Sequence, residues 1–96
     1  MGKVRPIRKG LVQATGECMA CGKRNCRLDC HEILNGPLRE KTLGETCLLL
    51  VLCWDCNSME MTDKSKWPVA RQLALLMEHS PEHYDIARFN WLRNPN

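Results

Sequence analysis

Two Cys-x-x-Cys pairs constrain this chain more than any other feature of its sequence. Cys18 and Cys21 form the first pair, with Gly22 directly after it, and Cys53 and Cys56 form the second. Two residues between thiolates let a tight turn aim both sulfurs at one tetrahedral ion, and a following glycine can adopt the positive φ that such a turn needs. The pairs therefore predict a structural zinc site, in which four cysteines hold Zn²⁺.

The cysteine count favours metal binding over disulfide bonding. The chain has 7 cysteines, an odd number, in 96 residues, and residues 1–10 lack the apolar core of a signal peptide. We therefore expect a cytoplasmic protein, in a reducing compartment that disfavours disulfides. A redox Cys-x-x-Cys is the alternative, but no strand–helix–strand pattern surrounds either pair. Cys30 and Cys47 are expected in the core, whereas Cys26 could compete for the ion.

The length of the chain predicts one small domain over residues 1–96. Domains of this size commonly need a stabilising cross-link, or staple, such as a bound zinc ion. The longest apolar run, residues 47–54, is far shorter than the roughly 20 residues of a membrane-spanning helix, so no membrane partner is expected. The expected parts are a basic arm at 1–14, a zinc-stapled core at 15–66 and C-terminal helices at 67–93.

The pattern of apolar residues predicts a β-hairpin followed by a helix. Residues 28–34 alternate as a half-buried strand does, and residues 46–52 form an apolar run of strand length. Residues 55–66 contain no glycine or proline and are expected to be helical. The turn that holds Cys18 and Cys21, here called the knuckle, is thus followed by the hairpin and then by the helix. This is the order of elements in a treble clef. The predicted fold class is therefore α+β, with a small zinc-stapled ββα-metal core and two additional C-terminal helices.

The two C-terminal helices are predicted from apolar spacing and from start signals. The first follows Pro68 and carries one apolar face made of Val69, Leu73, Leu76 and Met77. The second is expected to begin at Ser80 as its N-cap, with Pro81 in the first turn. Its packing face would contain Tyr84, Ala87 and Trp91. Core or half-core positions are expected for the tryptophans, with stacking on nucleic-acid bases as the alternative; they are Trp54, Trp67 and Trp91.

Basic residues are concentrated at the amino-terminal end. Residues 1–28 carry 7 basic side chains against 1 acidic one, whereas residues 29–96 carry 7 basic and 10 acidic ones. Residues 1–13 are interrupted by Pro6 and Gly10 and are expected to form an irregular or short-strand arm. The charge favours a polyanion, nucleic acid first, and a solvated basic tail is the simpler alternative. The candidate DNA-binding residues are Lys3, Arg5, Arg8, Lys9, Lys23, Arg24 and Arg27.

Four side chains suited to hydrolysis lie between and just after the cysteine pairs. They are Asp29, His31, Glu32 and Asn57. If zinc ties the knuckle to the start of the helix, the hairpin brings these side chains together. Oxygen and nitrogen ligands around an open position suit Mg²⁺, Mn²⁺ or another divalent ion, and a nearby imidazole can take a proton from water. Alternatively, His31 is a structural zinc ligand and Asn57 is a helix cap.

These motifs, in this order, resemble those of HNH, or ββα-metal, endonucleases of the zinc-stapled kind. The family includes the phage endonuclease VII group and small HNH proteins of phages and prophages. The resemblance covers residues 18–62 and rests on Cys18-x-x-Cys21, Leu28-Asp29-Cys30-His31-Glu32-Ile33, Leu49-Leu50-Val51-Leu52-Cys53 and Cys56-Asn57. It implies a metal-dependent endonuclease that is phage or prophage encoded, acts in the cytoplasm of a bacterial host and cuts DNA, branched DNA included.

Carried over by position, the resemblance implies that His31 is the general base. Asp29 and Asn57 would be ligands of the catalytic divalent ion, with Glu32 as a substitute ligand. In an alternative register Glu32 is the base and His31 is a ligand of that ion.

A second hypothesis is a non-catalytic zinc module that binds nucleic acid or a protein partner. The middle asparagine of the His-Asn-His motif that names the HNH family is absent. Cys47 and Leu48 occupy the position at which it is expected. The acidic and histidine residues are also separated by Cys30. Finally, residues 68–92 could form the face of a homodimer, because nucleases of branched DNA often act in pairs.

Overall fold

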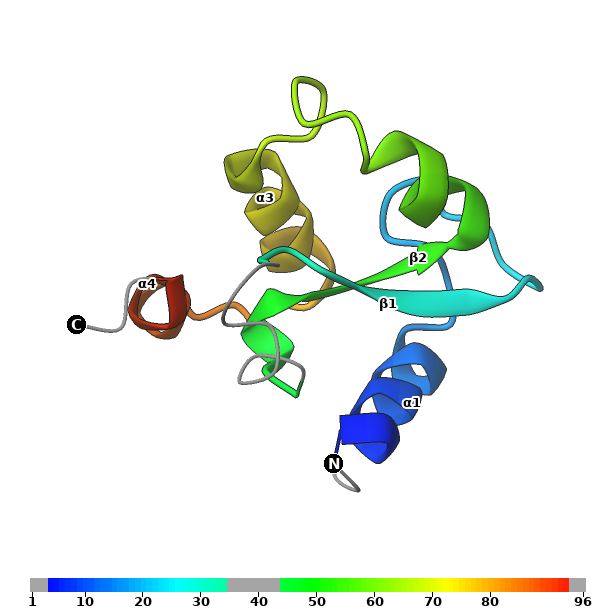
Figure 1. The fold of residues 1–96 in the computed structure, drawn as a ribbon. Helices are drawn as coiled ribbons and strands as arrows, with labels where there is room; N and C mark the ends of the chain where they lie inside the picture. The colour runs from blue at the N-terminus through cyan, green and yellow to red at the C-terminus, as the bar shows by residue number, and fades with distance from the viewer. Residues whose placement is uncertain (1–3, 35–43, 94–96) are drawn as a thin grey trace.

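The computed structural model describes residues 4–34 and 44–93, and a two-stranded β-hairpin lies at its centre (Figure 1). Strand β1 (Leu28–Glu32) pairs antiparallel with β2 (Leu49–Cys53), with Leu28 opposite Cys53 and Glu32 opposite Leu49. The predicted hairpin of an α+β fold is therefore confirmed. The predicted turn at residues 35–37, and the connection up to residue 43, lie outside the described residues.

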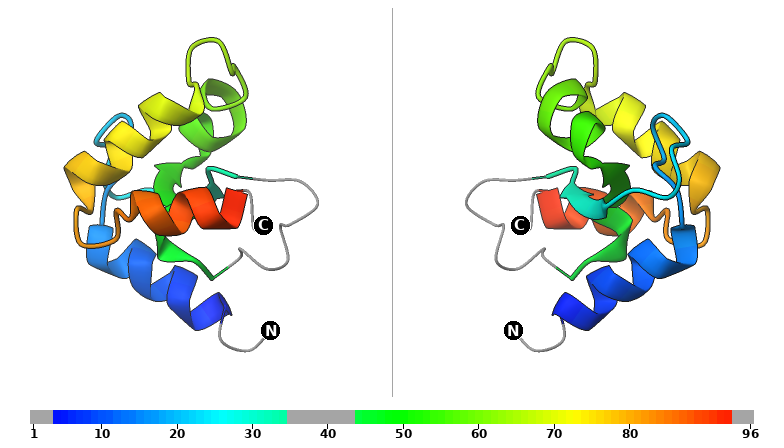
Figure 2. Two further views of the ribbon diagram at one scale, coloured as in Figure 1. Left: turned by 90° about the vertical axis from the view of Figure 1, so that its left-hand side faces the viewer. Right: turned by 90° about the vertical axis from the view of Figure 1, so that its right-hand side faces the viewer.

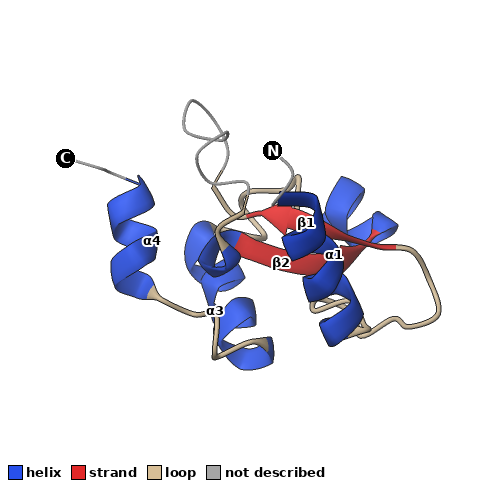
Figure 3. Cartoon of the chain, turned by 90° about the horizontal axis from the view of Figure 1, so that it is seen from below, coloured by secondary structure: helices blue, strands red, loops and turns tan. Residues whose placement is uncertain are grey.

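Helices lie on both sides of the hairpin. Helix α1 (Val4–Thr15) packs against one face, and η2 (Cys56–Glu60) and α3 (Val69–His79) lie on the opposite side (Figures 1 and 3). Helix α4 (Ile86–Arg93) contacts η1 (Thr46–Leu48), the 3₁₀ turn that leads into β2 (Figure 2). In the described part of the chain, no helix combines the length and apolar character that crossing a membrane requires.

The core is built around β2, whose five residues are all buried. A strand covered on both faces needs apolar residues at every position, and this explains the unbroken run of leucine and valine. Each fully buried leucine contributes roughly 2 kcal/mol of hydrophobic stabilisation. The predicted strand at residues 46–52 is correct in kind, but its first turn is the 3₁₀ helix η1.

The predicted irregular or short-strand arm at residues 1–13 is wrong, because most of it forms helix α1. Pro6 lies in the first turn, where a backbone N–H has no helical acceptor, so its ring breaks no hydrogen bond. Leu11 is buried and Val12 packs against the core. Tertiary packing of this apolar face therefore overcomes the low helix propensity of Pro6 and Gly10.

The predicted helix at residues 55–66 is shorter than expected. Its helical residues run from Trp54 to Glu60, and the segment from Cys56 is a π-helix in which Met61 N–H donates to the Cys56 carbonyl at 2.9 Å. The turn that follows is held by Asp63, whose Oδ1 accepts from the Ser65 hydroxyl at 2.6 Å. A carboxylate that bonds its own neighbours competes with helix continuation, and this ends the element.

Helix α3 follows Pro68 as predicted, but the face that it buries differs. Leu76 and Gln72 are fully buried, whereas Met77 is 56% exposed. Val69 and Leu73 pack at the edge of the core. A polar glutamine thus occupies a position in the apolar stripe, and the methionine one residue past Leu76 turns to solvent.

Helix α4 begins later than its predicted start at Ser80. Ser80 is buried at the end of α3, and the side chain of Asp85 caps α4 by accepting from Arg88 N–H at 2.9 Å. Phe89 and Leu92 are the buried residues of α4, so the expected face is wrong.

The three residues of the expected face are not in the core. Tyr84 is half-buried, and Ala87 and Trp91 are exposed. Of the other two tryptophans, Trp67 is buried as expected and Trp54 is 63% exposed.

Candidate metal centre and the adjacent histidine site

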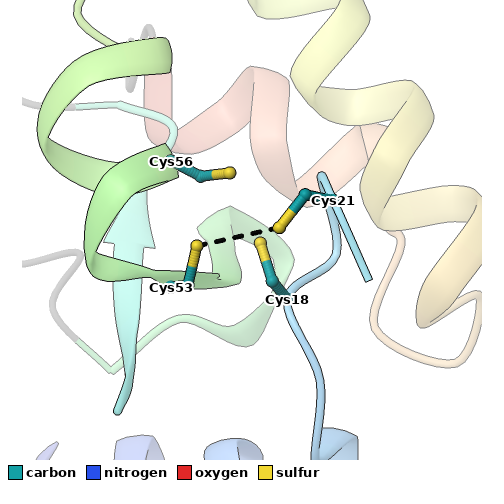
Figure 4. Close-up of side chains that lie close together, drawn as sticks. All are labelled: Cys18, Cys21, Cys53 and Cys56. Atoms are coloured by element: carbon teal, nitrogen blue, oxygen red, sulfur yellow. Dashed lines mark hydrogen bonds between the residues drawn. The ribbon is translucent and has the colours of Figure 1, made fainter. Parts of the chain in front are cut away.

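The sulfurs of Cys18, Cys21, Cys53 and Cys56 point toward one another (Figure 4). Their Sγ atoms all lie within 4.8 Å of one another, and Cys21 Sγ is 3.8 Å from Cys53 Sγ. Four sulfurs at about 2.3 Å from a tetrahedral zinc ion are about 3.8 Å apart, so the cluster has the size of a zinc–thiolate site. The four cysteines could therefore hold a metal ion such as zinc.

The amino-terminal pair is positioned by backbone hydrogen bonds to the sheet. Met19 N–H donates to the Val51 carbonyl at 2.9 Å, which ties the knuckle to β2. Gly22 N–H donates to the Cys18 carbonyl at 2.8 Å and closes the turn, and Gly22 has a φ of 78°. A side chain at this φ would be strained, so the glycine after the pair has the role that its sequence position predicts.

The carboxyl-terminal pair is positioned by a change of secondary structure. Cys53 is the last residue of β2, and Cys56 is the first residue of η2. A strand that turns directly into a helix places both sulfurs on the side of the knuckle (Figure 4). The predicted order of knuckle, hairpin and helix is present in the described residues.

The cluster has the electrostatics of a site that needs a cation. Burial raises the pKa of Cys18, but backbone hydrogen bonds from Cys53, Cys21 and Ala20 outweigh it and lower the pKa to about 7. The pKa of Cys56 is strongly raised, first by burial and then by the neighbouring thiols of Cys18, Cys53 and Cys21. One thiolate is therefore stabilised by backbone donors, and further thiolates need a positive charge between them.

The other cysteines lie outside the cluster. Cys47 is buried, and Cys30 is half-buried in β1, where its thiol contacts the Arg8 carbonyl at 3.6 Å. Burial raises the pKa of both thiols, as expected for inert cysteines in a core. Cys26 lies against the Lys23 carbonyl at 3.9 Å and does not compete for the ion.

His31 occupies a separate site on β1, opposite Leu50. Its Nε2 is 2.9 Å from Oε1 of Gln72, in α3. Burial lowers the pKa of His31, and this effect outweighs the opposite effects of the hydrogen bond to Gln72 and of the nearby Asn57 side chain. The imidazole is therefore neutral near pH 7. The cluster of possible metal ligands contains only cysteines, so the alternative of His31 as a structural zinc ligand finds no support.

Asp29 and Asn57 are related to the histidine site in different ways. Asp29 lies two residues before His31 in β1 and therefore on the same face of the strand. Its carboxylate forms a 3.4 Å ion pair with Arg27, at a solvent-accessible position. Asn57 is half-buried in η2, and its side chain interacts with the His31 ring. Asn57 lies inside the helical segment that starts at Trp54, so it is not the N-cap.

Glu32 does not join this site, contrary to the expected convergence of four side chains. It follows His31 directly in the strand and therefore points to the opposite face. There it is 7% exposed and forms a 3.1 Å ion pair with Arg8 of α1. Arg8 also donates to the Cys30 carbonyl at 2.9 Å. The sequence analysis did not anticipate this ion pair, because helix α1, which supplies the partner charge, was not predicted.

The candidate DNA-binding residues divide into two groups. Arg8 turns inward to Glu32, whereas the exposed members in the described chain are Lys9, Lys23, Arg24 and Arg27. Arg24 pairs with Glu17 at 3.1 Å and Arg27 with Asp29. Lys3 and the side chain of Arg5 lie outside what the structure describes. Lys23 and Arg24 are exposed and follow directly after Cys21 and Gly22 of the first pair.

Gln72 is the functional candidate that sequence reasoning missed. A weak signal was present, because Gln72 lies three residues after Val69 and four before Leu76, within the apolar stripe of the helix. A polar residue at such a position needs a buried partner.

Comparison of the chain with protein families, curated proteins and solved structures gave no match.

Proposed function

We propose that this protein is a metal-dependent endonuclease of the HNH type that hydrolyses DNA phosphodiester bonds and is encoded by a phage or prophage. One observation carries the proposal. The side chain of Asn57 influences the His31 ring on β1, and Asn57 directly follows Cys56 of the four-cysteine cluster. A treble-clef-like core with bound zinc would hold the strand and the helix in this arrangement.

In the proposed reaction His31 is the general base. Its neutral ring takes a proton from water as the water oxygen attacks phosphorus, the ester P–O bond breaks, and the leaving oxygen takes a proton from solvent. Asp29 and Asn57 offer a carboxylate and an amide oxygen, which are ligands that Mg²⁺ and Mn²⁺ accept. When bound there, the divalent ion would stabilise negative charge on the phosphate.

The Arg27–Asp29 ion pair does not oppose this assignment. Arg27 is 82% exposed and Asp29 is 44% exposed, and exposed ion pairs contribute only about 0–1 kcal/mol. A divalent ion or a phosphate group would exchange easily with such a pair. Lys23, Arg24 and Arg27 would then contact the DNA backbone beside the reacting phosphate.

A plasmid-nicking assay tests the proposal. Wild type and His31→Ala are incubated with supercoiled plasmid in Mg²⁺, Mn²⁺ or EDTA, at equal zinc content. We expect metal-dependent nicking by wild type, its loss in His31→Ala, and full activity in the control His79→Ala, which removes an exposed histidine of α3. Equal activity of wild type and His31→Ala would refute the assignment of His31.

A non-catalytic zinc module that binds nucleic acid or a protein partner is the second candidate. It is favoured by the engagement of both His31 and Asp29 with other protein side chains. Such a module would bind DNA with a strong salt dependence and would not cleave plasmid or branched DNA with any metal. Sedimentation of the protein with and without branched DNA would also test whether residues 68–92 form the face of a homodimer.

A further inference from the structure

Gln72, in the first turn of α3, has a fully buried side chain whose amide is hydrogen-bonded at both ends. Its Nε2 donates to the Trp67 carbonyl at 2.9 Å. Its Oε1 lies 2.9 Å from Nε2 of His31. Burying an amide without partners costs free energy, and here both partners are present. The two hydrogen bonds therefore define the orientation of this side chain.

The hydrogen-bonding pattern also defines the tautomer of His31. A main-chain carbonyl only accepts hydrogen bonds, so the contact with Trp67 identifies the NH₂ end of the Gln72 amide. The amide oxygen therefore faces His31, and an oxygen of this kind only accepts. Nε2 of His31 must consequently carry the hydrogen and donate it to Gln72. In a neutral imidazole only one nitrogen is protonated, so Nδ1 keeps its lone pair.

We propose that Gln72 is a positioning residue, which holds the His31 ring as the Nε2–H tautomer and makes Nδ1 the atom that takes the proton from water. The proton-transfer part rests on the proposed endonuclease function, whereas the tautomer assignment does not. In the step, Nδ1 gains the proton while the water oxygen forms its bond to phosphorus and the ester P–O bond breaks. The leaving oxygen is protonated by solvent water.

The surroundings of Gln72 are built to fix this contact. Gln72 N–H donates to the Pro68 carbonyl at 3.1 Å, so the residue belongs to the first turns of α3. The Trp67 indole Nε1–H donates to Glu60 at 3.3 Å, which links the start of α3 to η2. Because η2 carries Asn57, the two helical segments that contact His31 are also joined to each other. Helix α3, which lies outside the HNH-like motif, thereby gains a role in the site.

Nitrogen-15 NMR of the histidine rings in zinc-loaded protein tests the tautomer directly. In wild type we expect His31 to have a protonated Nε2 and an unprotonated Nδ1 above the pH at which the ring gains a second proton. Gln72→Leu removes the acceptor and is expected to give a mixture of tautomers. Gln72→Glu keeps an acceptor oxygen and is expected to retain Nε2–H. Leu76→Ala, which disturbs the same helix at a buried position, is the matched control and should leave the tautomer unchanged.

Cleavage kinetics test the proton-transfer part. Loss of a residue that orients a functional histidine typically lowers activity about 10–100-fold, so we expect that reduction in kcat for Gln72→Leu, with an unchanged KM for DNA. Partial recovery of kcat is expected in Gln72→Glu. A merely structural role would instead lower activity in parallel with folded, zinc-bound protein, and Leu76→Ala would then behave like Gln72→Leu.

The outcomes separate the two levels of inference. A protonated Nδ1 in wild type, or an unchanged tautomer in Gln72→Leu, overturns the role of Gln72. The expected tautomers together with an inactive wild type support the positioning contact and refute the endonuclease proposal. If Gln72→Leu does not fold, the wild-type spectrum and Gln72→Glu decide, because loss of Nε2–H in either one overturns the assignment.

Discussion

Replacing Cys21 by serine removes one ligand of the candidate zinc site with little change to the core. Cys21 is the exposed member of the cluster, whereas Cys18, Cys53 and Cys56 are buried. An ion that joins Cys21 to Cys53 closes a loop across a sequence separation of 32 residues. In the chain-entropy description of a cross-link, a loop of this length stabilises the folded state by about 3.7 kcal/mol.

This free energy is large compared with the stability of a small domain, which is about 5–15 kcal/mol. For a domain of this size each kcal/mol shifts Tm by about 4–8 °C, so Cys21→Ser should lower Tm by about 15–30 °C when the ion is lost. Thermal unfolding followed by circular dichroism, with zinc content measured on the same samples, is the assay. Cys26→Ser is the matched control, because Cys26 lies in the same loop but outside the cluster, and its Tm should change by only a few degrees. A Tm for Cys21→Ser within a few degrees of wild type would refute the reasoning.

Two further predictions concern charges on the two faces of β1. Arg8→Met removes the cation that faces the nearly buried Glu32 and should lower the free energy of unfolding by about 2–3 kcal/mol. Arg24→Met breaks an exposed ion pair and should lower it by less than about 1 kcal/mol. Equal effects of the two substitutions in denaturant titrations would contradict the burial argument. Burial lowers the pKa of His31, so the folded state binds fewer protons than the unfolded state on acidification. The neutral His31 ring therefore contributes to the free energy of unfolding above pH 6.5. This contribution is lost as the pH falls through the lower pKa of the folded state. Denaturant titrations in excess zinc should therefore show a smaller loss of stability on acidification for His31→Gln than for wild type, and an equal loss in the two proteins would contradict this reasoning.

The parts of the fold that the sequence predicted are those in which the signal is local. Two cysteines with two residues between them can meet only in a tight turn, and the apolar run in β2 can be buried only if both of its faces are covered. The hairpin, the four-cysteine cluster and helix α3 followed from such patterns. Helix α1 did not, because Pro6 and Gly10 oppose helix formation locally and only packing of Leu11 against the core makes the helix stable.

The same distinction applies to the histidine site. Strand alternation places Asp29 and His31 on one face, and it also places Glu32 on the other, so the expected convergence of Glu32 conflicted with the period of a strand. The contact between His31 and Gln72 joins residues that are 41 positions apart. A contact at this separation depends on how α3 crosses the sheet, which apolar spacing alone does not specify.

The most direct test of the account is the zinc X-ray absorption spectrum of the purified protein. The four-cysteine cluster predicts one zinc ion per chain with four sulfur ligands at about 2.3 Å. Loss of the zinc ion in Cys21→Ser and an unchanged spectrum in Cys26→Ser would complete the expected result. A protein without stoichiometric zinc, or a zinc ion bound mainly by nitrogen and oxygen, would contradict the scaffold on which the proposed site depends.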